Sequence, residues 1–133
     1  MPFDGVEAPD LVALDKLEAT RELIANQQRW CKGSLINAFG QMCILGALRR
    51  AEAEDELSAP MLAAIRDVTG KTFRSIERFN DHHATTHAMV MQVFDQTRQG
   101  LLSGHYVAGR QPSVLGRWRS VCRRYVTAPL TNA

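Results

Sequence analysis

Cysteine, histidine and aspartate side chains occur in the middle of this chain at spacings that could support nucleophilic catalysis. A thiolate nucleophile needs a base within reach and a positive environment, such as the N-terminus of a helix. Cys43 stands near the expected start of a helix, and the segment FNDHH at residues 79–83 supplies Asp81 and His83. These three residues would form the Cys–His–Asp site of a hydrolase or transferase.

The surroundings of Cys43 favour a structural role instead. This residue stands in the apolar run MCILGAL, residues 42–48. An unpaired cysteine is more often a small buried apolar side chain than a nucleophile. We therefore expect Cys43 to be buried and unreactive, and a cysteine-dependent enzyme is kept as an alternative. Cys31 and Cys122 have still less catalytic context around them.

Metal and nucleotide sites find little support in the sequence. His83 and His87 are four residues apart and would share a helix face only if the helix began early enough. The segment DHHATTH lacks the glutamate of the HExxH pattern, and the threonines at 85 and 86 are expected to begin the helix. Asn80 and Asp81 are better suited to capping backbone N–H groups at the turn. Neither GxxxxGK[ST] nor GxGxxG occurs, so the sequence predicts no metal and no cofactor.

The C-terminal part has the clearest pattern for binding, with five arginines and no acidic residue after Gly104. The segment SVLGRWRSVCRRYV, residues 113–126, projects onto a helix with an apolar arc and a basic remainder. Such a helix suits an anionic partner, which could be a phosphate backbone, an acidic protein groove or lipid headgroups. The residues expected to bind the partner are Arg117, Trp118, Arg119, Arg123, Arg124 and Tyr125.

The same helix could instead pack on its own domain. Its apolar arc comprises Val114, Leu115, Trp118, Val121, Cys122 and Tyr125. Docking of this arc on the core would leave only a solvated basic face. Residues 1–28 carry six carboxylates against Lys16 and Arg21, so the two ends of the chain could attract one another, within one molecule or between two.

Length and composition bound the class of protein. A chain of 133 residues predicts one domain with a real core, and 45% hydrophobic with 23% charged residues argues against wholesale disorder. No apolar run approaches the roughly 18 residues of a membrane span, and the first residues lack the pattern of a secretion signal. The odd count of three cysteines predicts a cytoplasmic protein with reduced thiols.

The predicted fold is all-α: a compact bundle of four or five short helices with at most a small two-stranded element near residues 32–41. We expect a flexible leader at 1–9, a helical core at 10–103 and a basic extension at 104–133 with a helix at about 113–126. The core helices are expected at 10–28, 42–54, 58–70, 72–80 and from 85 or 86 to the glycines at 100 and 104.

The helix at 42–54 is expected to be central because its first turns are apolar on all sides. Gly46 costs a helix about 1 kcal/mol relative to alanine. A glycine at this position therefore predicts a close crossing by another helix.

Three short motifs occur in a distinctive order: Trp30-x-x-Gly33, then Cys43-x-x-Gly46-Ala47-Leu48, then Phe79-Asn80-Asp81 before a threonine-capped helix. This order resembles a family of small, uncharacterised bacterial and phage proteins in which tryptophan often stands where this chain has Phe79. The likeness covers roughly residues 20–100. The resemblance implies a shared fold and brings no established activity with it.

The leading functional interpretation is a small, non-enzymatic binding or accessory protein that engages an anionic partner through its arginine-rich C-terminal helix. A protein partner or a second copy of the chain is expected first. Nucleic acid is the alternative within binding. The alternative from another class is the cysteine-dependent enzyme that uses Cys43 with a histidine of the 82–87 cluster.

Overall fold

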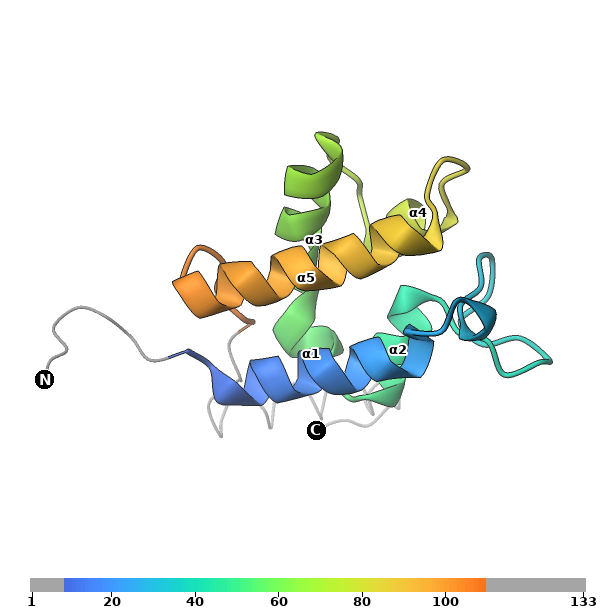
Figure 1. Ribbon diagram of the computed structural model, residues 1–133, viewed down its shortest axis with the longest axis horizontal. Coiled ribbons are helices and arrows are strands. Elements are labelled where there is room, and N and C mark those ends of the chain that lie inside the picture. Colours follow the sequence, from blue (N-terminus) through green and yellow to red (C-terminus); the bar gives the residue numbers. More distant parts are fainter. Residues whose placement is uncertain (1–8, 110–133) are drawn as a thin grey trace, which may run out of the picture.

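The computed structural model describes residues 9–109 as five α-helices and one short 3-10 helix (Figure 1). Their bounds are α1 Leu11–Ile24, η1 Gln27–Arg29, α2 Ile44–Arg50, α3 Glu54–Thr69, α4 Ile76–Asp81 and α5 His87–Ser103. The predicted all-α class is therefore confirmed. The residues expected to bind a partner, Arg117 to Tyr125, lie outside the described residues, as does the predicted helix at 113–126.

Helix α3 crosses behind α1 and α5, which run side by side across the front of Figure 1. It packs mainly on α5, and α1 contacts α2, α3 and α5. The core between these helices is filled by fully buried side chains, among them Leu48, Leu57, Phe79 and Phe94. None of the helices described between residues 9 and 109 combines the length and apolar character that crossing a bilayer requires.

Helix α1 begins where the sequence predicts, because Asp10 accepts a hydrogen bond from the backbone N–H of Ala13 at 3.0 Å. It ends at Ile24, four residues earlier than expected, because Asn26 caps the separate 3-10 turn η1. The buried residues of α1 lie on one side, and its other side remains exposed.

Helix α3 begins at Glu54, earlier than the expected cap at Ser58. The hydroxyl of Ser58 donates to the carbonyl of Glu54 inside the helix at 2.6 Å and caps nothing. Three acidic residues in the first turn favour this earlier start through the helix dipole. Pro60 then lies inside the helix, where it has no N–H to donate to the carbonyl of Glu56. The backbone N–H of Gly109 donates to this carbonyl instead, at 2.8 Å.

Helix α2 is shorter than the predicted helix at 42–54. The element that crosses it at Gly46 also differs from the predicted helix. A Cβ atom at Gly46 would lie 2.0 Å from the carbonyl oxygen of Leu35, so the crossing element is the backbone of loop 31–41 and not another helix. This loop forms isolated bridges from Trp30 and Ile36 to Met42. Within residues 9–109 the backbone pairing remains limited to isolated bridges, and no two-stranded element occurs.

Helices α4 and α5 deviate from the prediction at their ends. Ser75 caps α4, so this helix starts four residues later than expected. Thr86 caps α5 by accepting from the N–H of Met89 at 3.2 Å, as expected. Helix α5 continues past Gly100 and ends at Gly104, which has a φ of 79°.

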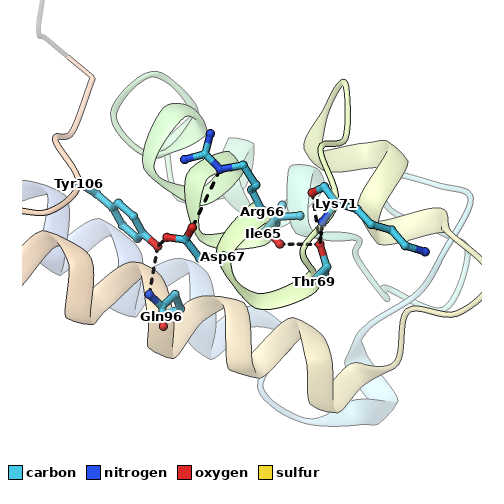
Figure 2. A network of polar contacts seen from close by, with 7 residues as sticks. All are labelled: Ile65, Arg66, Asp67, Thr69, Lys71, Gln96 and Tyr106. Atoms are coloured by element: carbon cyan, nitrogen blue, oxygen red, sulfur yellow. Dashed lines mark hydrogen bonds and ion pairs between the residues drawn. The ribbon is translucent and has the colours of Figure 1, made fainter.

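The end of α5 is fixed to α3 by Tyr106, whose hydroxyl donates to a carboxylate oxygen of Asp67 and accepts from Nε2 of Gln96 at 3.1 Å (Figure 2). We call Asp67, Gln96 and Tyr106 the Tyr106 cluster. The ring of Tyr106 covers Gly100, where a Cβ atom would lie 2.0 Å from ring carbon Cδ2. Burial and the hydrogen bond to Asp67 raise the pKa of Tyr106 above its usual value.

Candidate functional site

Asn80 is the polar centre of the molecule and has no exposed surface. Its Oδ1 accepts hydrogen bonds from the indole Nε1 of Trp30 at 2.7 Å and from the backbone N of Ile44 at 3.1 Å. Its Nδ2 donates to the carbonyl of Cys31 at 3.1 Å and to Oδ1 of Asp81 at 2.9 Å. These residues, Trp30, Cys31, Ile44, Asn80 and Asp81, form what we call the Asn80 cluster.

The four hydrogen bonds use the full capacity of the Asn80 amide, which can accept twice and donate twice. They also fix its orientation, because the indole of Trp30 and the backbone N–H of Ile44 can only donate. Ile44 is the first residue of α2, so Asn80 on α4 caps a helix that is 36 positions earlier in the sequence. Asn80 therefore caps a backbone N–H group as expected, but this group belongs to α2 and not to its own turn.

Asp81 ties the same cluster to loop 31–41. Its Oδ1 accepts from the backbone N–H of Gly33 at 2.9 Å as well as from Asn80. Lys32 reaches the carbonyl of His82 at 2.7 Å and lies 5.8 Å above the ring of Trp30. The carboxylate predicted as a catalytic partner thus positions the loop that follows Trp30.

Cys43 lies beside this cluster as the N-cap of α2. It is buried, and its Sγ accepts a hydrogen bond from the backbone N–H of Gly46 at 3.3 Å. Desolvation by burial raises the pKa of the thiol, although two backbone N–H groups oppose this effect. The thiol form, which is the poorer nucleophile, is therefore favoured at neutral pH.

Cys31 is partly buried, and its Sγ donates to the carbonyl of Ser34 at 3.5 Å. Burial raises the pKa of this thiol, and the nearby Cys43 and Asp81 raise it further. Neither cysteine of the described residues has the depressed pKa that characterises a reactive thiolate.

The histidines do not converge on Cys43. The exposed His83 stacks on His82 with ring centroids 4.4 Å apart, and His82 accepts from the backbone N–H of Ala84. His87 lies 2.8 Å from the carbonyl of Ile24 through Nε2 and packs beside Trp30. Within residues 9–109, no hydrogen bond connects a histidine to the sulfur of Cys43, and no three metal-binding side chains gather.

An open cleft of about 640 Å³ lies beside α4. Its lining includes two arginines, Arg74 and Arg78, and two carboxylates, Glu77 and Asp81. The remaining lining comes from Thr72, Phe73, Ser75 and His82. Because opposite charges are present in equal number, the cleft has no strong preference for an anion or a cation.

Loop 31–41 exposes apolar side chains although its backbone is well connected. Phe39 is 87% exposed and Ile36 is 56% exposed. Asn37 holds the tip of the loop by accepting from the backbone N–H groups of Phe39 and Gln41 at 2.9 and 3.0 Å. A fixed loop that presents an aromatic ring to solvent is a candidate contact surface for a protein.

The sequence pattern singled out Trp30, Cys43 and Asn80 without showing that the Asn80 amide holds Trp30 and the start of α2 together. Trp30 and Asn80 are fifty positions apart, and local spacing carries no information about such a contact. The order of the three short motifs was the only feature of the sequence that linked Trp30, Cys43 and Asn80. Their polar atoms meet because both Trp30 and the N-terminus of α2 need a buried hydrogen-bond partner.

Comparison with family models matches residues 8–100 of the chain to a family of unknown function, DUF6197. The match covers well over half of the sequence, and the chain belongs to this family. It contains the entire Asn80 cluster and ends before Tyr106. The comparisons found no match among curated proteins or among solved structures.

Proposed function

We propose that this protein is a small, non-enzymatic binding or accessory protein that engages an anionic partner through residues 113–126, here called the arginine segment. The observation that carries the proposal is the separation of charge along the chain. Of the 16 lysines and arginines, five arginines follow Gly109 without any acidic residue. The first 109 residues contain all 14 carboxylates and are therefore net acidic.

The described residues support binding in preference to catalysis. Cys43 and Asp81, which a cysteine-dependent hydrolase or transferase would need, hold backbone groups in place. The raised pKa of Cys43 keeps the thiol protonated at neutral pH. The enzymatic alternative would therefore require a rearrangement that exposes the sulfur and brings a histidine to it.

An acidic protein surface is favoured over nucleic acid, because Ile36 and Phe39 offer a second, apolar contact that a phosphate backbone would not use. Arginine makes bidentate contacts to carboxylates and phosphates alike, so nucleic acid is the alternative. We place the protein in the cytoplasm of bacteria or of phage-infected cells as part of the same proposal.

The test compares heparin and short duplex DNA as anionic probes at two salt concentrations. Replacing Arg117, Arg119, Arg123 and Arg124 with glutamine should weaken heparin binding by about tenfold or more and lower the salt slope by about three. Helix propensity changes little in this variant. Thermal stability should also change little, because exposed charges contribute little to folding.

A matched control removes four exposed cations of the core: Arg29→Gln, Arg50→Gln, Arg74→Gln and Arg98→Gln. This control has the same net charge as the segment variant and should retain most of the heparin affinity. Equal loss in both variants would show that only total charge matters and would refute the role of the arginine segment. Heparin binding without DNA binding would argue against nucleic acid as the partner.

A further inference from the structure

No element within residues 9–109 covers the exposed side of α1, which has a distinct composition. Its exposed residues fall on one arc of the helix, opposite the buried Ala13, Leu17 and Thr20. We call this arc the outer face of α1; it comprises Leu11, Val12, Asp15, Glu18, Ala19 and Glu22. Leu11 is 68% exposed and Val12 is 55% exposed, so the face contains apolar as well as acidic positions.

The carboxylates of the outer face have no ion-pair partner within residues 9–109. The ion pairs of this part of the chain join Lys16 to Glu56, Arg49 to Glu54 and Arg66 to Asp67. Within the described residues, Asp15, Glu18 and Glu22 therefore present three negative charges without a close ion pair on successive turns of a single helix. The arginine segment is the part of the chain with the opposite charge.

The spacing of the arginine segment matches that of the outer face. On α1 the exposed positions follow the pattern i, i+1, i+4, i+7, i+8, i+11 from Leu11. The apolar positions of the segment follow the identical pattern from Val114 to Tyr125. Both helices would contain 14 residues and measure about 21 Å, so the segment is long enough to lie along the whole outer face, with its arginines beside the apolar arc.

The chain also leaves the described region at a suitable place. The backbone N–H of Gly109 donates to the carbonyl of Glu56, and the carboxylate of Glu56 accepts from Nζ of Lys16 on α1 at 3.0 Å. A Cβ atom at Gly109 would lie 2.0 Å from the carbonyl oxygen of Asp55, so the chain passes α3 closely here. Residues 110–112 can span about 10 Å beyond Gly109.

From these observations we propose that residues 113–126 of the same chain dock as a helix on the outer face of α1. The apolar arc of the segment covers Leu11, Val12 and Ala19, and its flanking arginines reach the three carboxylates. The docked state regulates the proposed function, on which this part of the inference rests. An anionic partner must compete with Asp15, Glu18 and Glu22 for the same arginines.

The test measures amide hydrogen exchange of residues 113–126 in the full chain. The variant Asp15→Asn, Glu18→Gln, Glu22→Gln removes the charges of the outer face. The control Glu52→Gln, Glu77→Gln, Asp95→Asn removes three exposed carboxylates elsewhere. We expect exchange in the wild type to be at least about tenfold slower than in a free peptide of this sequence. This protection should disappear in the outer-face variant and persist in the control.

Two results would overturn docking within one molecule. The first is a segment that exchanges like a free peptide in the wild type, or equally slowly in both variants. The second is protection that disappears on twentyfold dilution, which would show that the segment binds α1 of a second copy. Protection that decreases with added salt in the wild type supports the charge pairing.

Heparin affinity then tests the competition separately. Both variants have the same net charge, so a difference between them reports the loss of the internal competitor. We expect the outer-face variant to bind heparin about fivefold more tightly than the control, because more of its arginines are available. Equal heparin affinity of the two variants would refute the proposed competition between the outer-face carboxylates and an anionic partner. If the exchange results hold while the wild type binds no anionic probe, docking stands and the proposed function fails.

Discussion

The Asn80 cluster lies near the start of α5, where Trp30 packs beside His87, and the Tyr106 cluster lies toward its end (Figure 2). The two clusters fix their surroundings in different ways. Asn80 is fully buried and bonds to an indole, a carboxylate and two backbone groups. Tyr106 bonds to two side chains at the protein surface. The Asn80 cluster fixes the backbone at Cys31 and Ile44, on both sides of loop 31–41. The Tyr106 cluster attaches the end of α5 to α3.

The same difference appears at the glycine beside each cluster. Gly46 faces the carbonyl of Leu35, whereas Gly100 faces the ring of Tyr106. A side chain can rotate away from a new methyl group at moderate cost, and a hydrogen-bonded backbone cannot. The comparison therefore predicts that damage at the Asn80 end is larger and harder to relieve than damage at the Tyr106 end.

The largest effect is expected for Asn80→Ala. This change leaves the buried indole N–H of Trp30 and the backbone N–H of Ile44 without their acceptor. We expect a loss of about 3–4 kcal/mol in the free energy of unfolding, measured by urea denaturation. The control Asn37→Ala removes an amide whose bonds are local to the exposed loop, and it should cost about 1 kcal/mol. Equal losses of unfolding free energy in the two variants would mean that burial of Asn80 adds nothing to the stabilising effect of its hydrogen bonds.

The next largest effects are expected for alanine substitutions at Gly46 and Gly100. In an unhindered helix, glycine to alanine stabilises by about 1 kcal/mol. Gly46→Ala should instead destabilise by about 3 kcal/mol and Gly100→Ala by about 1 kcal/mol, because the new Cβ overlaps a backbone carbonyl in the first case and a side-chain ring in the second. Thermal melts of double variants sharpen the distinction. Tyr106→Ala should make Gly100→Ala stabilising, since the obstructing ring is gone. Leu35→Ala should not rescue Gly46→Ala, and rescue there would show that the backbone of Leu35 can move.

The smallest effect is expected for Tyr106→Phe, which keeps the ring over Gly100 and removes only the hydroxyl. The loss should be about 1 kcal/mol at neutral pH, because the freed groups lie near solvent. The raised pKa of Tyr106 adds a pH dependence. Its contribution is complete below pH 10 and is lost as the pH rises through the raised pKa of the folded state.

Urea melts between pH 8 and pH 11 measure this dependence. The wild type should lose stability above about pH 10 more steeply than Tyr106→Phe. The raised pKa of Cys43 contributes a similar decrease that begins near pH 9 and is common to both proteins. Parallel curves for the two proteins would show that the Tyr106 hydroxyl titrates alike in the folded and unfolded chains.

Local signals in the sequence predicted the features that depend on neighbouring residues. Asp10 and Thr86 cap helices where expected, and the apolar run around Leu48 is buried. Two of the errors occur where distant groups decide. Pro60 indicates a helix start by its usual preference, yet it is accepted inside α3 because Gly109 uses the carbonyl that it leaves free. Gly46 correctly indicated a close approach, but spacing could not identify a loop as the neighbour.

The hydrogen bonds of Asn80 have a consequence for folding kinetics. Trp30 and Ile44 are fifty and thirty-six positions from Asn80, so these contacts close long loops and have a high entropic cost early in folding. We therefore expect these contacts to form after the helices on both sides are in place. Contacts of this kind oppose unfolding more than they accelerate folding. Asn80 therefore governs how long a folded molecule persists, while the helices govern how quickly it forms.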